Sequence, residues 1–424
     1  MSKKKKSALS KADGLIPELR FPEFKNEGEW EEKELDYSLD YLQPTPYLVE
    51  STDYNDKYKT PVLTAGKSFI LGYTNEDKGI FKNNLPVIIF DDFTTATQFV
   101  DFPFKGKSSA MKILKAKKDA DIKFLFESMQ LIKYEVGVHQ RHWISIFSKL
   151  KIPAPKLNEQ QKIASCLSSL DEVIANHSQK LELLKDHKKG LMQNLFPTNS
   201  ITNDQLRITE DNDQFVIRNS QTRNLPKVRF KEFEKNGEWV EKKLGDKDVA
   251  FIVNEKTSIS KLNIETYIST ENMLPDFTGV SAASKLPPTG SFTKFKIGDI
   301  LISNIRPYLK KVWKSDKIGG ASNDVIVFRS SSGVLSEFLE FLIKNETFIN
   351  YVMESAKGVK MPRGDKDSML NYPVFIPTKE EQIKIGSCLS SLDEIITSQT
   401  EKIEQLKHHK KGLMQGLFPK MIDI

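Results

Sequence analysis

Residues 163–197 read IASCLSSLDEVIANHSQKLELLKDHKKGLMQNLFP, and residues 385–419 read IGSCLSSLDEIITSQTEKIEQLKHHKKGLMQGLFP. Roughly two-thirds of the aligned positions are identical, a level that indicates an internal duplication. Neither copy contains a proline before its last residue, so each predicts one long helix that Pro197 or Pro419 ends. The chain is therefore expected to be organised around two near-identical long helices.

A second pair of matching blocks opens the two halves of the chain. Residues 19–35 read LRFPEFKNEGEWEEKEL, and residues 228–244 read VRFKEFEKNGEWVEKKL. Each half thus runs from an opening block through a long variable region to the repeated helix. The two variable regions barely resemble each other. Such a chain is expected to present two different recognition surfaces on one constant frame.

Composition limits the class of protein. The chain has 424 residues, of which 38% are hydrophobic and 10% aromatic, enough for two ordinary cores. The net charge of +6 and the pI of about 8.8 favour an anionic partner such as nucleic acid, although charge alone does not establish one.

The cysteines and the N-terminus indicate a cytoplasmic protein. Cys166 and Cys388 occupy equivalent positions in the two repeats, and two cysteines cannot form a disulfide framework or a zinc cluster. They are expected to be reduced, partly buried thiols. No apolar segment follows the basic run Lys3 to Lys6, and no window is long enough to span a membrane, so neither a secretory signal nor membrane attachment is expected.

The predicted fold class is α+β. We expect two mixed α/β domains in a pseudo-two-fold arrangement, separated by two long helices that form an antiparallel coiled coil. Apolar runs predict strands at 85–90, 298–305 and 324–328, and helices at 117–134 and 335–355. The predicted segments are a flexible basic tail (1–13), the first variable domain (14–155), the first helix (156–197), a linker (198–224), the second variable domain (225–377) and the second helix (378–419).

Both repeated helices carry a heptad pattern in which spacings of three and four residues alternate, as in a coiled-coil seam. The apolar seam positions are Ile163, Leu167, Leu170, Ile174, Leu181 and Leu184 in the first copy, and Ile385, Leu389, Leu392, Ile396, Ile403 and Leu406 in the second. Each helix is about 55–60 Å long at 1.5 Å per residue, and one turn of B-DNA spans about 34 Å, so the pair could serve as a spacer between two DNA-reading domains.

Polar residues interrupt the seam at the same levels in both copies. Lys188 and Lys410 share one level, and His177 and Gln399 share another, which is how a coiled coil specifies register and pairing. The other copy is the nearest candidate partner, although each helix could instead pack only on its own domain. Glycine recurs within both helices, at residues 190 and 412, either because the backbones cross closely there or because the copies share ancestry.

The sequence carries no recognisable catalytic motif. The TAGKS stretch at 64–68 has Pro61 where a phosphate-binding loop needs glycine, and no metalloprotease, dinucleotide-binding or methyltransferase pattern is present. Basic clusters with neighbouring aromatic residues instead suit contacts to phosphates and base edges. The predicted DNA-binding residues are Lys105, Lys107, His139 and Arg141 in the first variable domain, and Arg306, Lys310, Lys357, Lys360 and Arg363 in the second.

This combination of motifs resembles the specificity subunit of type I restriction-modification systems. Each helix opens with an EQ.KI element, at 159–163 and 381–385, and closes with KKGLMQ.LFP. Residues 88–104, IIFDDFTTATQFVDFPF, and 298–311, GDILISNIRPYLKK, look like two lineages of that family's target-recognition domains. The resemblance covers essentially the whole chain.

The resemblance implies a subunit without catalytic activity or a cofactor of its own. Each recognition domain would read one half of a bipartite, asymmetric site in double-stranded DNA, and the coiled coil would set the gap. Two modification subunits that bind S-adenosylmethionine would methylate adenine, and two restriction subunits would use ATP and Mg²⁺. Outward-facing helix residues such as Glu172, Lys180, Glu394 and Lys402 would contact a partner. The alternatives are a stand-alone DNA-binding protein, a coiled-coil scaffold and an enzyme fusion, the last of which lacks a motif.

Overall fold

The computed structural model describes residues 15–64, 68–134, 142–197, 215–217, 224–356 and 360–420. The chain divides into two compact units, residues 1–178 together with 401–424, and residues 179–400. Each unit contains one variable domain and one segment of each long helix. The compact units therefore differ from the consecutive segments that the sequence suggests, because both helices contribute to both units.

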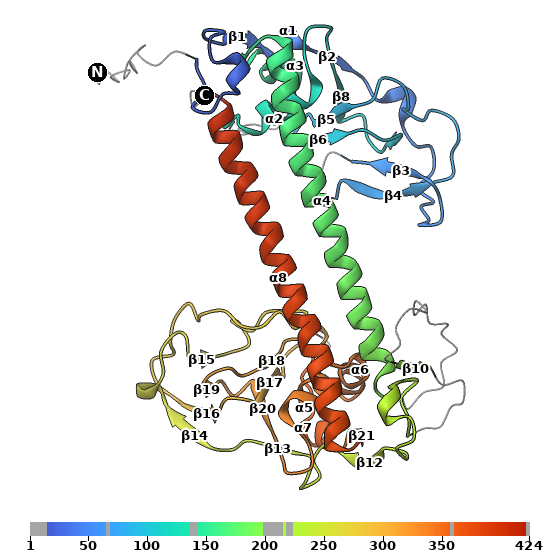
Figure 1. Ribbon diagram of the computed structural model, residues 1–424, viewed down its shortest axis with the longest axis vertical. Coiled ribbons are helices and arrows are strands. Elements are labelled where there is room, and N and C mark those ends of the chain that lie inside the picture. Colours follow the sequence, from blue (N-terminus) through green and yellow to red (C-terminus); the bar gives the residue numbers. More distant parts are fainter. Residues whose placement is uncertain are drawn as a thin grey trace. The chain divides into compact units, whose positions relative to one another are not determined.

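The two long helices are α4, Leu157–Asn194, and α8, Lys379–Leu417. In the first unit the start of α4 lies beside the end of α8, so the helices are antiparallel there (Figure 1). Lys410 Nζ lies 2.7 Å from the Asp171 carboxylate in this unit, and Lys188 pairs with Asp393 in the second. These reciprocal ion pairs confirm that the two copies pair with each other, and they involve the two lysines predicted as polar seam positions.

The predicted seam rows lie on the inner faces of the helices. Near the domains these rows also enter the cores, since Ile163 and Leu167 pack in one cluster with Trp30 and Met414. Helix pairing and packing on a domain, weighed as alternatives from the sequence, are thus combined. Every predicted seam residue is buried or half-buried: Ile163, Leu167, Leu170, Ile174, Leu181, Leu184, Ile385, Leu389, Leu392, Ile396, Ile403 and Leu406.

The two helical glycines do not mark a close backbone crossing. A Cβ atom placed on Gly190 or Gly412 would meet no neighbouring atom within 4 Å. The interpretation of close crossing is therefore wrong, and shared ancestry of the duplicate is the explanation that remains.

Gly412→Ala should stabilise the first unit. The position is exposed and has room for a methyl group, and alanine is preferred over glycine in a helix interior by about 1 kcal/mol. Urea unfolding of the isolated chain, followed by hydrogen exchange of peptides from the first unit, would measure the gain. A loss of stability would show that glycine has a packing role at this position.

The first variable domain is built on an antiparallel four-stranded sheet in the order β2-β8-β5-β6. Helix α2 packs on this sheet and carries Phe124 and Leu125 into the core beside α4 and α8. A three-stranded sheet, β4-β3-β7, encloses a second core. The elements are β1 (Glu31–Glu34), α1 (Leu35–Ser38), β2 (Leu39–Leu42), β3 (Thr60–Leu63), β4 (Ile70–Thr74), β5 (Val87–Asp91), β6 (Thr97–Val100), β7 (Lys105–Gly106), β8 (Met111–Ala116), α2 (Ile122–Gln130), α3 (His142–Ser145) and β9 (Lys151–Ala154).

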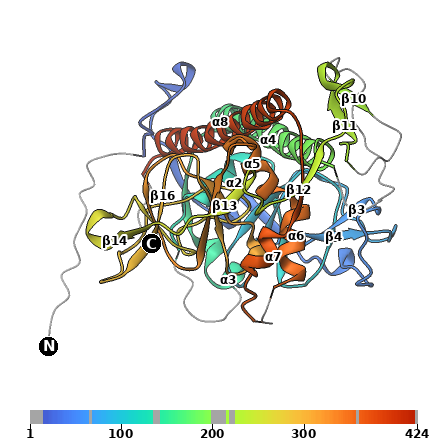
Figure 2. The same ribbon diagram turned by 90° about the horizontal axis from the view of Figure 1, so that it is seen from below.

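The second variable domain repeats this architecture despite its different sequence. Its main sheet has the order β13-β20-β17-β18, and a second sheet has the order β14-β16-β19-β15. Helices α5, α6 and α7 pack together on one side of the domain (Figure 2). The elements are β10 (Phe215–Ile217), β11 (Val228–Phe230), β12 (Val240–Lys243), β13 (Ala250–Ile252), β14 (Lys256–Ser258), β15 (Tyr267–Ile268), β16 (Ser291–Phe295), β17 (Ile300–Ser303), β18 (Val312–Lys314), β19 (Gly319–Ala321), β20 (Val325–Ser330), α5 (Ser336–Lys344), α6 (Glu346–Glu354), α7 (Lys366–Leu370) and β21 (Pro373–Ile376).

One predicted helix is divided in the structure. The apolar pattern over 335–355 predicts a single helix, but Asn345 adopts an extended conformation between α5 and α6. Its side chain caps α6 by accepting a hydrogen bond from the Thr347 amide at 3.1 Å and donates to the Met192 carbonyl at 2.9 Å. A capping asparagine thus ends one helix and starts the next.

A buried arginine–glutamate pair fastens each opening block to the start of a long helix. Arg229 forms a bidentate bridge to Glu381, with both N···O distances 2.7 Å, and both side chains are 1% exposed. Arg20 and Glu159 form the same bridge in the first unit. This contact explains why the RF of the opening block and the glutamate of the EQ element are repeated together.

The glutamine of the EQ element holds the variable domain. Gln160 accepts a hydrogen bond from the Asp121 amide at 3.0 Å and donates to the Pro155 carbonyl at 2.8 Å. Gln382 accepts from the Leu335 amide at 2.9 Å and donates to the carbonyls of Gly333 and Pro377, at 3.0 and 3.1 Å. In both units one side chain therefore fixes the start of the domain helix to the frame.

The carboxylate of Glu340 on α5 gives the second unit an acid-sensitive contact. Burial alone would raise the pKa of this group, but Lys344 and Lys314, at 2.7 and 2.9 Å, hold it below its ordinary value. Since the folded pKa is the lower one, the contribution to stability is present above about pH 4.3 and is lost as the pH falls through the folded pKa.

Glu340→Gln should consequently make the acid unfolding of the second unit less steep. The variant removes a group that binds fewer protons in the folded than in the unfolded state. The exposed Glu337 on the same helix provides the control Glu337→Gln. Equal pH profiles for both variants between pH 3 and 5 would contradict the expected role of Glu340.

Candidate nucleic-acid interface

Two basic clusters of the second variable domain lie side by side although they are far apart in the sequence. The segment after β17 contains Arg306, and the segment before α7 contains Arg363. The Arg306 amide donates to the Pro362 carbonyl at 2.9 Å, and the Gly364 amide donates to the Asn304 carbonyl at 3.1 Å. The backbone therefore joins the two predicted DNA-binding clusters into one surface.

Charged and amphipathic side chains project from this surface. Arg306 and Lys360 are exposed, and the side chain of Arg363 is 58% exposed while its Nη1 atom lies 3.1 Å from Asp324 Oδ1. Tyr308 and Met361, each 49% exposed, lie beside these basic residues in the sequence. The combination suits phosphate and base contacts with apolar packing beside them.

The backbone at this surface is held in an unfavourable conformation. Arg306 and Lys310 have φ angles of +52°, and Asp276 and Phe277, which donate hydrogen bonds to this turn, have φ angles of +51° and +61°. Left-handed non-glycine residues cost on the order of 1–3 kcal/mol each and concentrate at functional sites. The strain supports a functional role for the turn formed by 306–310.

Lys310 and Lys357, also predicted as DNA-binding residues in this domain, are not among the freely exposed residues described above. Lys310 is partly engaged, because its Nζ atom lies 2.7 Å from Glu346, and this hydrogen bond lowers the pKa of that carboxyl. Lys357 lies outside the described residues.

The first variable domain requires one correction. Lys105 is 3% exposed, and its Nζ atom lies 2.6 Å from both the Glu76 carboxylate and the Lys78 carbonyl. The side chain serves the core of the domain, so it is not available to DNA. Lys107 is half-buried, with its Nζ atom 5.7 Å from the centre of the Tyr54 ring.

The predicted contacts His139 and Arg141 belong to the stretch HQRHW, residues 139–143, which is only partly described by the structure. Both lie outside the described residues. His142 and Trp143 are buried, and their amides donate to the Asp92 carbonyl and the Asp92 carboxylate, each at 2.9 Å. The tryptophan is therefore a core residue of the first variable domain.

The two domains share a backbone contact directly after a central strand of the main sheet. Asp92 follows β5 as Asn304 follows β17. The Asp92 carbonyl accepts a hydrogen bond from His142, the first residue of α3, and the Asn304 carbonyl accepts one from Gly364, just before α7. In both domains an arginine, Arg141 or Arg363, directly precedes the residue that donates this bond. The pattern of anchoring could not be recognised from the sequence, because the segments share almost no residues.

A polar cavity of about 450 Å³ in the second domain has Asp324, the ion-pair partner of Arg363, in its wall. Its wall includes Tyr267, Ser269, Asn272, Ser322 and Asp324. Burial raises the pKa of the Tyr267 hydroxyl, which therefore stays protonated and able to donate. Hydroxyl and amide groups of this kind suit hydrogen bonds to a sugar-phosphate chain or to base edges.

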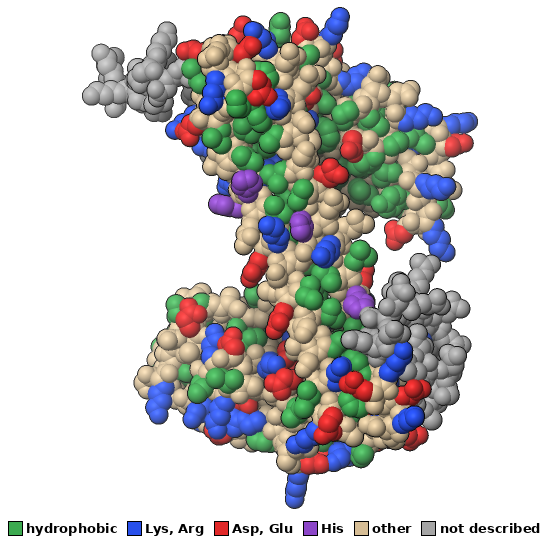
Figure 3. Space-filling view, viewed as in Figure 1, with side chains coloured by type: hydrophobic (Ala, Val, Ile, Leu, Met, Phe, Trp, Pro, Cys, Tyr) green, Lys and Arg blue, Asp and Glu red, His purple; other side chains and the backbone are tan. Residues whose placement is uncertain are grey.

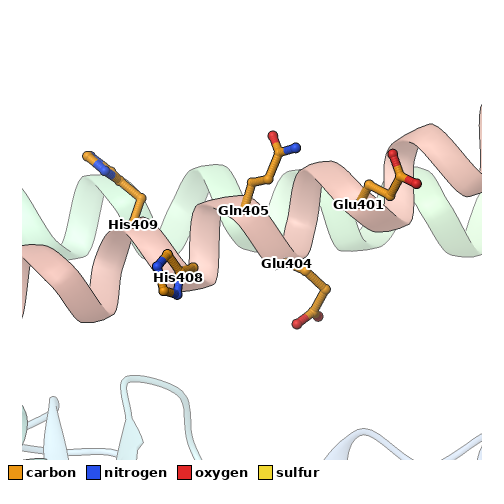
Figure 4. A pocket seen from close by; sticks show the side chains of 5 residues that line it. All are labelled: Glu401, Glu404, Gln405, His408 and His409. Carbon is orange, nitrogen blue, oxygen red and sulfur yellow. The ribbon is translucent and has the colours of Figure 1, made fainter.

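The described residues offer no convergent catalytic or metal-binding cluster. No group of three or more His, Cys, Asp or Glu side chains among them could hold a metal ion. A shallow depression on α8 is lined by Glu401, Glu404, Gln405, His408 and His409, but all five project from one helix and point in different directions (Figure 4). This depression does not have the geometry of an active site.

The outer faces of the long helices carry exposed side chains that do not belong to the domain cores. Glu172, Lys180, Glu394 and Lys402 are all exposed, as expected from the heptad register. Val173 and Ile395, at equivalent positions of the two copies, are also exposed. On the face shown in Figure 3, lysine and arginine alternate with acidic side chains instead of forming one patch, so net charge alone does not locate an interface. Within the described residues, no helix is long and apolar enough to cross a membrane.

Comparison with known proteins agrees with this geometry. The type I restriction modification DNA specificity domain matches residues 27–186 and 236–408. The chain is 48% identical over 139 residues to the type I restriction enzyme EcoR124I/EcoR124II specificity subunit of Escherichia coli, a match spanning 32% of this chain and 34% of that relative. It is 24% identical over 366 residues to the MjaVIII specificity subunit of Methanocaldococcus jannaschii, covering 80% of each chain.

A solved structure shows the same fold. The type I restriction-modification S subunit from M. genitalium superposes with a TM-score of 0.58, covering 96% of this chain and 100% of that one at 16% identity. The family match lies in both halves and extends over most of the residues. The chain therefore belongs to the type I restriction-modification DNA specificity family.

Proposed function

We propose that this chain is the non-catalytic specificity subunit of a type I restriction-modification complex in the cytoplasm. Each variable domain reads one half of a bipartite site in double-stranded DNA, and α4 and α8 set the gap between the halves. The observation that carries the proposal is the shared architecture of the two domains. In the first domain Asp92, directly after β5, accepts a backbone hydrogen bond from His142, the first residue of α3. In the second, Asn304, directly after β17, accepts one from Gly364, just before α7. Both frames also carry the same buried arginine–glutamate pair.

The contacts with DNA follow from the exposed basic residues. In the second domain Arg306, Lys360 and Arg363 form the proposed contact surface, since they are exposed and lie on joined segments. In the first domain we retain Lys107, His139 and Arg141. Phosphate contacts by lysine would position the duplex, while arginine at a base edge would supply sequence preference.

The proposed partners are two modification subunits and two restriction subunits. Glu172 and Glu394, and likewise Lys180 and Lys402, are exposed at matching positions of the two repeats, which offers two equivalent surfaces for two copies of one partner. The modification subunits would bind S-adenosylmethionine and methylate adenine, and the restriction subunits would use ATP and Mg²⁺. This chain supplies specificity and holds none of these cofactors.

Co-expression with a modification subunit from the same operon tests the proposal. Sequencing of methylated adenines in the host genome should give one motif with two specified halves around a fixed gap. A stable complex without any motif would contradict DNA reading and favour a coiled-coil scaffold. Tight, salt-dependent and sequence-specific binding by the chain alone would favour a stand-alone DNA-binding protein.

A further inference from the structure

Arg363, which precedes α7, is held differently from Arg329, a paired arginine on β20 of the main sheet in the second domain. Arg329 donates through Nε and Nη2 to Asp299, at 2.7 and 2.8 Å, and through Nη1 to Glu255 at 2.7 Å. All three nitrogens of that guanidinium are engaged. Among the described residues, Arg363 has one carboxylate partner, Asp324, which lies 3.1 Å from a single nitrogen, and more than half of the Arg363 side chain remains exposed. The rest of its donor edge is open to a ligand.

Both members of this pair stand on fixed backbone. Arg363 forms a β-bridge with Ile305, and the next residue donates to the Asn304 carbonyl. The Asn304 amide in turn donates to the Asp324 carbonyl at 2.8 Å, directly before β20. One residue, Asn304, thus ties the backbones of Arg363 and Asp324 together at the ends of two paired strands of the sheet.

We propose that Arg363 reads a guanine edge in the second half-site and that Asp324 is the positioning residue that orients it. The inference rests on the proposed function and assigns a base to one side chain. Guanine presents two acceptors in the major groove that match two donors of a guanidinium. A carboxylate that holds one side of the guanidinium reduces the rotamer freedom lost on binding and leaves the other donors for the base.

Substitutions can distinguish a guanine contact of Arg363 from a phosphate contact. Arg363→Lys keeps the positive charge but loses the planar pair of donors, so it should retain overall affinity and salt dependence while losing discrimination at one base pair. Arg363→Ala should lose the same discrimination, by about 5- to 150-fold between guanine and other bases. Asp324→Asn should weaken discrimination at the same position, because an uncharged amide holds the guanidinium less firmly.

The test uses the complete complex with its modification subunit, expressed with each variant, and determines the methylated motif by sequencing. The expected result is a wild-type motif containing guanine in one half, relaxed at that single guanine by Arg363→Lys and Arg363→Ala and partly relaxed by Asp324→Asn. Asp316→Asn is the matched control, since Asp316 is exposed and pairs with a neighbouring lysine at 3.7 Å. Its motif should be unchanged.

Several outcomes would overturn the inference while the proposed function stands. These are a wild-type motif without guanine, variants that keep every guanine, and a relaxation spread over many positions. Relaxation accompanied by a fall in melting temperature for Asp324→Asn alone would show a structural role for Asp324 and would also reject its positioning role. The absence of any motif in the wild-type complex would instead reject the proposed function itself.

Discussion

Replacing Glu381 by alanine should lower the free energy of unfolding of the second unit by about 3–5 kcal/mol. The substitution would leave the Arg229 guanidinium, which is 1% exposed, without its bidentate carboxylate partner. A buried charge without a partner carries a desolvation cost that water cannot relieve. Two backbone carbonyls, of Asn236 and Gly237, would remain as acceptors but carry no full charge.

Hydrogen exchange measured by mass spectrometry would follow each unit separately. Peptides from the second unit should lose protection, whereas peptides from the first unit, with an intact Arg20–Glu159 bridge, should change much less. Glu232→Ala is the matched control, because Glu232 and Lys384 form an exposed pair at 3.4 Å that also joins the second opening block to α8. Such a pair contributes roughly 0–1 kcal/mol, so equal effects of both variants would contradict the argument.

Asp92→Ala should have a comparable effect in the first unit, about 3–5 kcal/mol. Lys112 is fully buried, and its Nζ atom lies 3.2 Å from Asp92 Oδ2, close enough for an ion pair although the angle is not that of a hydrogen bond. Gln43 is the second polar partner, at 3.1 Å. The substitution would leave the ammonium group beside one neutral amide and would remove the acceptor of the Trp143 amide.

The functional consequence should be confined to one half of the DNA site. Loss of the Asp92 carboxylate would remove the acceptor of the Trp143 amide in α3, which directly follows the predicted contacts His139 and Arg141 in the sequence. In the co-expressed complex we expect methylation to lose specificity in one half of the motif and to keep it in the other. A double variant, Asp92→Leu with Lys112→Met, should recover most of the stability because no unpaired charge remains. Equal loss of specificity in both halves would contradict the assignment of one half-site to each domain.

The frame was predictable from the sequence because its interactions are local or repeated. The heptad spacing identified every seam residue on the inner faces of α4 and α8, since helical periodicity depends only on neighbouring positions. The repeated lysines at 188 and 410 also indicated the pairing of the helices, and the structure supplies their aspartate partners. Recurrence of a polar residue in an apolar row was the informative signal.

The candidate interface was predictable only in part. The sequence identified basic clusters around Arg306 and Arg363 but not their contact, because strand pairing between distant segments leaves no local pattern. Lys105 was predicted as a DNA contact and is instead buried. The closely spaced lysines at 105 and 107 suggested phosphate contacts, whereas the partner Glu76, which lies on a separate loop, makes Lys105 part of the core. Burial of a charged side chain depends on such partners and not on its sequence neighbours.

The hydrogen bonds of the glutamines in the EQ elements affect how freely the sequences of the two variable domains can diverge. Gln160 and Gln382 form hydrogen bonds to backbone amide and carbonyl groups of their domains. Every residue has these backbone groups whatever its side chain, except that proline has no amide N–H. These hydrogen bonds therefore do not depend on which side chains the contacted residues carry. Mutation can rewrite a recognition surface without demanding a compensating change in the helices, and two domains with almost unrelated sequences can evolve separately within one inherited framework.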